Sequence, residues 1–429
     1  MRLPMMLRTT LGRWSAWTVL FVAGALAIAV ALSVTQGLQQ RVGHDFHVFW
    51  QAGRNFASGD PLYHGYLPGA RVFKYPPFAA MVFQVVAPFS LQVAGAICSF
   101  LNLVLWGAAV YLTREIVART FPSRRHSPVP LVLAVVFTAQ FFLDNFHHVQ
   151  MNEIIFVLVM LGIHAYLRGK DVGAAAWLVA ATAIKITPIF FVAWLVIRGR
   201  RRAALAVPPL VLACVVVPLL VRGPARGSAE LVEYYHTFLE GHQHGGIRDY
   251  TAGQNLAGLV NRMTQPSASD RGATYGYLPT SDQTAQLAYK VLWATVFLIM
   301  ITKLVLLRRR GAPVSALELA MIFLAALLLS PITFLGHLVT LLFVYHAFLS
   351  IRLVSPAPPV RVAAALLVVA IAVTGLSGRD LAGRTVYLAI GGYSVYAWTM
   401  LLLFLAAVVL AGREHLWPQA SDRPFAPAC

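Results

Sequence analysis

The chain has 429 residues, of which 59% are hydrophobic and only 12% are charged. A soluble protein of this size carries about twice that charged fraction, so the composition argues against a soluble globular protein. The formal net charge is +18, but many basic residues stand in short clusters between apolar runs, as in the cytoplasmic loops of membrane proteins. Aromatic and basic residues do not interleave as they do on a nucleic-acid-binding surface.

Apolar runs recur from end to end, and a helix needs about 20 such residues to cross a bilayer. We therefore predict a single all-α polytopic membrane domain over residues 1–412, with about eleven to thirteen transmembrane helices. The first run follows Arg2, Arg8 and Arg13 and is interpreted as an uncleaved first helix rather than a signal peptide. The predicted spans are Ala16–Thr35, Gln92–Leu112, Pro130–Leu143, Ile154–Leu167, Ala203–Val221, Thr284–Leu307, Pro313–Leu329, Leu338–Ile351, Val360–Leu376 and Ile390–Ala411.

The basic clusters set the predicted orientation, because they belong on the cytoplasmic side. With both termini cytoplasmic, every second connection is basic and the scheme closes. A long first extracytoplasmic loop then covers residues 36–77, and another covers residues 222–283. The tail, residues 413–429, is predicted to be disordered.

Residues 173–197 do not fit simple alternation, because they lie between two basic connections that both belong inside. Two short half-helices joined at Lys185–Pro188 would solve this, since proline ends a helix and broken helices are tolerated where they line a cavity. Lys185 would then be at the tip of a hairpin, and a lipid phosphate is a natural partner for such a cation. The alternative is one ordinary helix with a snorkelling lysine.

The first extracytoplasmic loop holds Asp45 among histidine and aromatic side chains, close to the end of the first span. Desolvation there can raise the proton affinity of a carboxylate, which suits a general base. The alternative is that Asp45 caps a helix starting at Phe46. For Asp60, within Gly59–Tyr63, a turn is favoured.

A second extracytoplasmic turn contains Asp144, His147, His148, Gln150, Asn152 and Glu153. Adjacent histidines do not share a helical face, and spacing fixes no third ligand, so hydrogen bonding to sugar or phosphate is favoured over a metal site or plain interfacial polarity. Cys98, Cys214 and Cys429 are too scattered for a disulfide framework or a metal site. His337 follows another break between spans, where the alternative role is an ordinary interfacial histidine.

Several blocks, taken in order, resemble glycosyltransferase family 87, polytopic mannosyltransferases of the GT-C class. The resemblance covers most of the chain from Asp45 to His337, and Ala183–Pro188 is the sharpest match. Two departures are Val149, where the family has the glycine of Gly-Gln-x-Asn, and Phe334–His337, where it often has Trp, Asp and paired His. The other matching blocks are Asp45 with Gly59–Tyr63 and Tyr75–Pro77, Gln150–Asn152, Gln254–Gly258 and Ser330–His337.

The resemblance implies a GT-C-like bundle, a polyprenyl-phosphate-mannose donor and a lipid-linked or glycan acceptor on the extracytoplasmic side of a bacterial cell membrane. It implies an inverting reaction with Asp45 as general base and with no metal or cofactor. Lys185, His337 and Arg248 are then candidates to stabilise the leaving phosphate. The candidate substrate-binding residues are His44, Asp60, Tyr63, Tyr75, His147, His148, Gln150, Asn152 and Asn255.

Two other classes remain open at this point. A transporter or flippase of lipid-linked sugars would also use a broken helix and a buried cation. However, the polar residues concentrate at the extracytoplasmic connections, and the hydropathy shows no two-fold repeat. A membrane scaffold without catalysis would not explain a lysine within an apolar hairpin.

Overall fold

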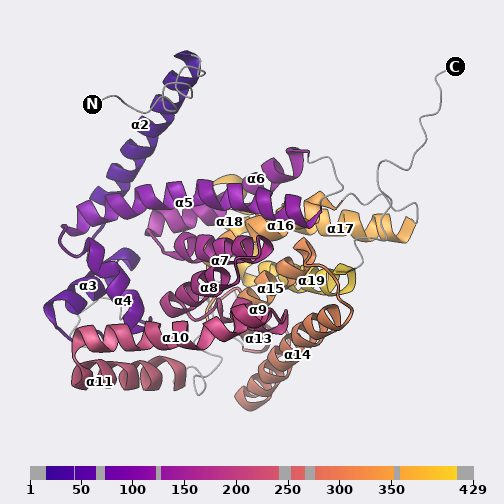
Figure 1. Cartoon of the computed structure of the whole chain (residues 1–429). Coiled ribbons are helices and arrows are strands. Elements are labelled where there is room, and N and C mark those ends of the chain that lie inside the picture. The colour runs from indigo at the N-terminus through magenta and orange to yellow at the C-terminus, as the bar shows by residue number, and fades with distance from the viewer. Residues whose placement is uncertain are drawn as a thin grey trace.

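The computed structural model describes residues 16–42, 44–63, 73–121, 127–240, 253–265, 276–351 and 358–412. Every regular element in these ranges is a helix, and this confirms the predicted all-α fold (Figure 1). The elements are α2 (Ala16–Leu38), α3 (Asp45–Ser58), α4 (Pro77–Phe83), η1 (Gln84–Val86), α5 (Leu91–Thr120), α6 (Val129–His148), α7 (Asn152–Leu167), α8 (Asp171–Ile184), α9 (Ile189–Ile197), α10 (Arg201–Arg222), α11 (Pro224–Tyr234), η2 (Tyr235–Glu240), α13 (Leu256–Thr264), α14 (Asp282–Arg309), α15 (Ala316–Leu329), η4 (Leu335–Thr340), α16 (Leu341–Ser350), α17 (Pro358–Gly375), α18 (Arg379–Gly392) and α19 (Val395–Leu410).

Four of the described helices, α5, α6, α10 and α14, are long and apolar enough to cross a bilayer, and α17 with α18, bent by 105°, gives up to five. Shorter apolar helices such as α7, α8, α15 and α19 accompany them. The outer helix α10 exposes leucine and valine side chains, whereas α15 is buried on almost every side. Apolar side chains thus face both the core and the surroundings, as in a polytopic membrane protein. The count of eleven to thirteen spans stays a prediction.

The segment around Lys185 turns back on itself, as the hairpin interpretation predicted. α8 ends at Ile184, Lys185 has extended backbone, and α9 begins at Ile189 after Pro188. A 14-residue helix is about 21 Å long, yet Arg200, just beyond α9, lies 2.9 Å from the Asp171 carboxylate at the start of α8. Both ends of the hairpin therefore lie at the same end of the bundle, which excludes a single continuous helix.

Basic connections gather at that end, which we call the basic end and define by Arg119, Arg168, Arg198, Arg200 and Arg308. The Arg308 guanidinium lies against Gly199, and both Arg119 and Arg168 act electrostatically on His164. An ion pair with a largely buried arginine side chain and a fully buried carboxylate also lies here, joining Arg198, just after α9, to Glu318 of α15. Glu318 accepts a further hydrogen bond from the Trp194 indole at 2.8 Å, and this second donor offsets the cost of burying the carboxylate.

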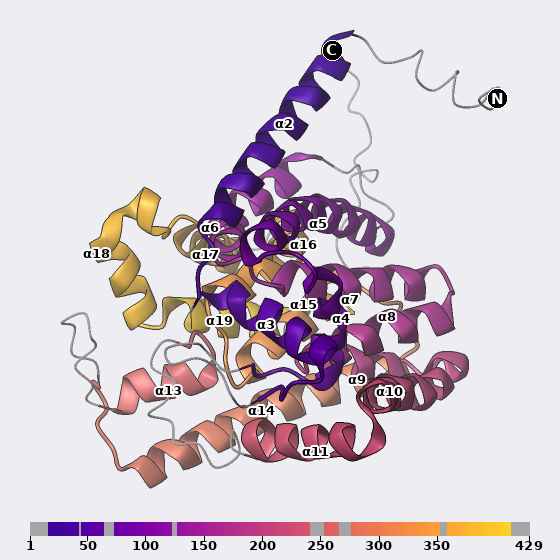
Figure 2. The same ribbon diagram turned by 90° about the vertical axis from the view of Figure 1, so that its left-hand side faces the viewer.

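The first loop folds against the opposite end of the bundle. Figure 2 views this end and shows α3 lying across the front of the other helices. Gly53 of α3 packs directly on the backbone of Phe83, where a Cβ atom would lie 2.4 Å from the carbonyl oxygen. This close approach, which a larger residue would prevent, sets the position of α3 on α4.

Arg222, at the end of α10, holds the C-terminal end of α3. Its guanidinium donates to the carbonyl oxygens of Asn55 (2.9 Å), Phe56 (3.1 Å) and Asp60 (2.5 Å), and pairs with the buried Glu230 carboxylate. The last carbonyls of a helix have no partner within the helix. Arg222 supplies partners for them and thereby links the first loop to α10 and α11.

Candidate active site

Asp45 is the first residue of α3, and its carboxylate accepts a hydrogen bond from the Gln150 side chain at 2.6 Å. The residue before the helix is His44, whose side chain makes no capping hydrogen bond. The alternative interpretation of Asp45 as the helix cap is therefore wrong. A carboxylate in the first turn of a helix is favoured by the helix dipole. Asp45 is half-buried.

The turn between α6 and α7 carries Gln150 and Asn152, and Val149 starts it. Val149 has φ 46° and ψ 52°, which is the left-handed region. This is a strained conformation for a β-branched residue. The family that the chain resembles has glycine at this position, and glycine adopts this conformation without strain. Asn102 of α5 supports the turn by donating to the Gln150 carbonyl at 3.0 Å.

We expect Val149→Gly to be more stable than Val149→Ala, which reverses the usual order of these two residues. Both variants lose the buried valine side chain, but only glycine relieves the left-handed strain, which amounts to about 1 kcal/mol. Thermal unfolding of the purified variants in one detergent would measure the difference. Val157, buried within helix α7, is the control position. There the alanine variant should be more stable than the glycine variant by about 1 kcal/mol. The same order at both positions would contradict the strain at Val149.

Lys185 is connected to Asp45 by a continuous polar network, which we define as Asp45, Gln150, Asn145, Asn152 and Lys185. The Lys185 ammonium donates to the Asn152 side chain at 2.8 Å, and Asn152 donates to the Asn145 side chain at 2.7 Å. The Gln150 backbone N–H donates to the Asn145 carbonyl at 3.0 Å. Asp45 and Lys185 thus bind side chains two positions apart on the same turn.

The break after α15 completes this end of the site. Asn145, fully buried, donates to the Gly336 carbonyl, and a Cβ at Gly336 would lie 2.7 Å from the Asn145 side-chain oxygen. This close contact requires glycine and places His337 beside the cavity. The Nδ1 atom of His337 accepts from the Phe334 backbone N–H at 3.0 Å. The neutral imidazole therefore carries its proton on Nε2, which is left as a donor.

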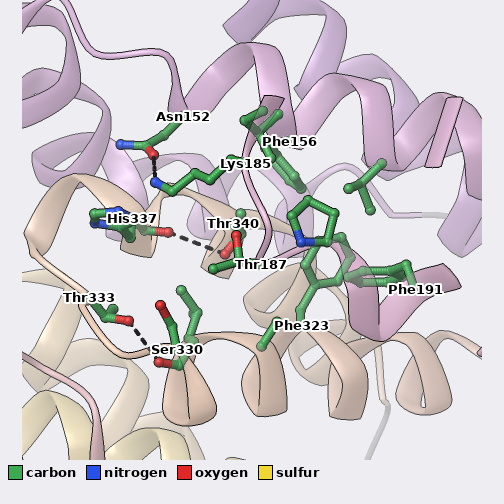
Figure 3. A pocket seen from close by; sticks show the side chains of 15 residues that line it. Asn152, Phe156, Lys185, Thr187, Phe191, Phe323, Ser330, Thr333, His337 and Thr340 are labelled. Carbon is green, nitrogen blue, oxygen red and sulfur yellow. Dashed lines mark hydrogen bonds between the residues drawn. The ribbon is translucent and has the colours of Figure 1, made fainter. Parts of the chain in front are cut away.

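Lys185 and His337 lie at one end of a cavity of about 60 Å³ (Figure 3). A single water needs about 10–15 Å³ by this measure, so the cavity has room for several. Figure 3 shows the Lys185 side chain directed toward Asn152. The lining is polar at this end and apolar beyond it. Polar lining comes from Asn152, Lys185, Thr187, Ser330, Thr333, His337 and Thr340, and the apolar part includes Ile155, Phe156, Val159, Phe191, Phe323 and Leu327.

Two predicted binding residues of the first loop have mainly structural contacts. The Tyr63 hydroxyl donates to the Tyr75 carbonyl at 2.9 Å, and the Tyr63 ring packs on Phe73. Burial, with a smaller contribution from Tyr234, raises the pKa of Tyr75 to about 12, so Tyr75 stays neutral. Asp60 is exposed and bonds to Ser58, as its turn interpretation predicted. α3, about 21 Å long, separates it from Asp45.

The remaining predicted residues divide into exposed, buried and undescribed ones. His44, His147 and His148 are exposed, and the His148 Nδ1 donates to the Asp144 carbonyl oxygen at 2.8 Å. Within the described ranges no three His, Cys, Asp or Glu residues are grouped closely enough to hold a metal ion. Asn255 is fully buried, bridges to the Ser330 and Pro331 carbonyls, and does not line the cavity. Arg248 lies outside the described residues.

Two site residues were not selected from the sequence. Asn145 makes the central contacts of the polar network, and Arg222 holds α3. A third group, Glu153, was noted only as part of a polar turn, yet its side chain is fully buried next to Asn152. Asn145 stands before the turn between α6 and α7 and Asn152 after it, and no local signal in the sequence marked Asn145.

Fold and site together define a polytopic α-helical membrane protein in which a polar network joins a carboxylate to a cation that lines one cavity. The sequence model of glycosyltransferase family 87 matches residues 73–331, more than half of the chain. The chain belongs to this family, as the resemblance predicted.

Two relatives share the name polyprenol-phosphate-mannose-dependent α-(1-2)-phosphatidylinositol mannoside mannosyltransferase. The protein from Mycobacterium tuberculosis is 27% identical over 272 residues, which cover 59% of this chain and 61% of the relative. The one from Mycolicibacterium smegmatis is 26% identical over 273 residues, 58% of each chain. The match thus spans about three fifths of the relatives' length.

Proposed function

We propose that this protein is a membrane glycosyltransferase that moves a sugar, mannose by analogy with its relatives, from a polyprenyl-phosphate donor to an acceptor hydroxyl. The observation that carries the proposal is the polar network, which joins the half-buried Asp45 carboxylate to the half-buried Lys185 ammonium, and Lys185 lines the cavity. Family membership and the names of the two relatives support this choice of donor. Those names also make a phosphatidylinositol mannoside the first acceptor to test.

Asp45 acts as the general base in this proposal. Its carboxylate takes the proton of the acceptor hydroxyl, whose oxygen attacks the anomeric carbon while the bond from that carbon to the phosphate oxygen breaks. Gln150 donates to one carboxylate oxygen and so fixes its direction. A single displacement of this kind inverts the anomeric carbon. It needs neither a protein nucleophile nor a metal.

Lys185 and His337 stabilise the leaving phosphate. The bond electrons remain on the phosphate oxygen, so negative charge develops there, and the Lys185 ammonium together with the His337 Nε2–H can bind it. The apolar part of the cavity, with Phe156, Phe191 and Phe323, suits the start of a polyprenyl chain. One cavity thus offers both the charge and the apolar surface that a lipid phosphate requires.

We further propose that the site faces the extracytoplasmic side and that both termini are cytoplasmic. The basic end, rich in arginine, lies opposite the polar network, and clusters of this kind stay in the cytoplasm. The Leu307 side chain lies against Gly412 near the end of the described chain, which places that end at the basic end too.

A labelling experiment tests this orientation. In a protein whose native cysteines are replaced by serine, Ile186→Cys at the hairpin tip should react with a membrane-impermeant thiol reagent added to intact cells. Arg202→Cys, exposed beyond the basic end of the hairpin, should react only after permeabilisation. The opposite pattern would reverse the proposed orientation.

The decisive test of function is transfer of radiolabelled mannose from polyprenyl-phosphate mannose to phosphatidylinositol mannoside by the purified protein. Label in the acceptor lipid establishes the glycosyltransferase. If label stays in the donor while the protein moves donor across liposome membranes, the chain is a carrier of lipid-linked sugars and the proposal fails.

A further inference from the structure

Glu153 is a buried carboxylate for which the proposed mechanism has no use. It is the second residue of α7, and its exposed fraction is 0%. Neither carboxylate oxygen accepts a hydrogen bond from another residue in the described part of the chain. An ionised group in such a position is costly unless an opposite charge compensates it, so its surroundings matter.

Lys185 supplies the positive charge that can compensate the Glu153 carboxylate. Glu153 directly follows Asn152, which binds the Lys185 ammonium, and Glu153 and Lys185 interact electrostatically. Asp144 of α6 adds a second negative group to the same neighbourhood. His337 adds no fixed charge, because its Nδ1 already accepts from the Phe334 N–H. The negative groups near Lys185 thus partly offset the positive charge that would bind the phosphate.

We propose that Glu153 is a specificity-determining residue that makes the phosphate site prefer the singly charged donor over the doubly charged product. The inference rests on the proposed function. A polyprenyl-phosphate sugar is a phosphodiester with one negative charge. Transfer breaks the bond between the anomeric carbon and the phosphate oxygen and leaves a phosphate monoester. Its second pKa is about 6, so at neutral pH the product carries nearly two charges.

The Glu153 charge repels the two lipids unequally, because Coulomb energy scales with the product of the charges. The product, with twice the negative charge, is repelled about twice as strongly in free energy. Glu153 therefore favours release of polyprenyl phosphate after transfer and limits its competition with the donor.

The test is binding of polyprenyl-phosphate mannose and of polyprenyl phosphate to the purified protein at pH 8.5, without acceptor. For Glu153→Gln we expect about tenfold tighter binding of the donor and about a hundredfold tighter binding of the product. Glu153→Asp keeps the charge and should keep the wild-type ratio of the two Kd values. Glu115→Gln removes a carboxylate at the basic end of α5 and should change neither of the two Kd values.

Acidity provides an internal control. At pH 5 the Glu153 carboxyl is protonated, because burial raises its pKa to about 8, so Glu153→Gln should change neither Kd value. Equal shifts of the two Kd values at pH 8.5, or no shift in either at that pH, would overturn the inference while leaving the donor assignment in place. Failure of the wild type to bind either lipid would instead overturn the proposed function and this inference together. A melting temperature of Glu153→Gln at or above that of the wild type confirms that the variant is folded.

Discussion

Asp45→Asn is expected to lower kcat for mannose transfer by about 10²–10⁴-fold, the usual contribution of a general base. Asparagine keeps the size of the side chain and can still bond to Gln150 after its amide turns, so the helix start should be preserved. It cannot take the proton of the acceptor hydroxyl. The affinity for polyprenyl-phosphate mannose should stay within about twofold of wild type, since the proposed contact between the donor phosphate and Lys185 is unchanged. Initial rates at saturating donor and acceptor measure the effect.

Asp60→Asn is the matched control for this variant. Asp60 is an exposed carboxylate just beyond the opposite end of the same helix, so its loss should leave kcat unchanged. Wild-type turnover by Asp45→Asn, with folding verified, would remove Asp45 from the mechanism. Equal losses in both variants would indicate that the first loop tolerates no change of charge.

The residues that could be predicted from the sequence are those whose chemistry conflicts with their surroundings. Lys185 stands in an apolar run followed by Pro188, and a buried cation beside a helix-breaking residue requires an explanation within the local sequence itself. The Arg200–Asp171 contact confirms the resulting hairpin. Asp45 was likewise selected from its position just beyond a span, and its catalytic role stays a prediction.

The residues that escaped prediction act through contacts distant in the sequence. Asn145 contacts Gly336, 191 positions away, and Arg222 contacts Asn55, 167 positions away. Nothing in the local sequence distinguishes either from an ordinary interfacial polar residue, because their role depends on how the helices pack. Asn255 shows the converse. It was selected as a binding residue, but its amide bonds to the Ser330 and Pro331 carbonyls and caps α13.

Lys185→Met is expected to lower kcat/KM for the sugar donor by about 10²–10³-fold. This is the usual effect of removing one hydrogen-bonding group that stabilises a developing oxyanion. Methionine retains most of the aliphatic length and removes the charge. The KM for the acceptor should stay near the wild-type value, because Lys185 lies on the phosphate side of the polar network. Lys290→Met, an exposed lysine of α14, is the control and should behave as wild type. Equal losses toward donor and acceptor would contradict the placement of the phosphate at Lys185.

The same variant separates the binding role of Lys185 from its role in stability. Lys185→Met leaves Glu153 buried without its compensating cation, so we expect a lower melting temperature. Adding Glu153→Gln removes the uncompensated charge and should restore the melting temperature, a coupling that a double-mutant cycle measures. Donor affinity should not return, because the phosphate still lacks its cation. Recovery of affinity together with stability would mean that Lys185 supports the fold alone, and the phosphate would then have to bind elsewhere in the cavity.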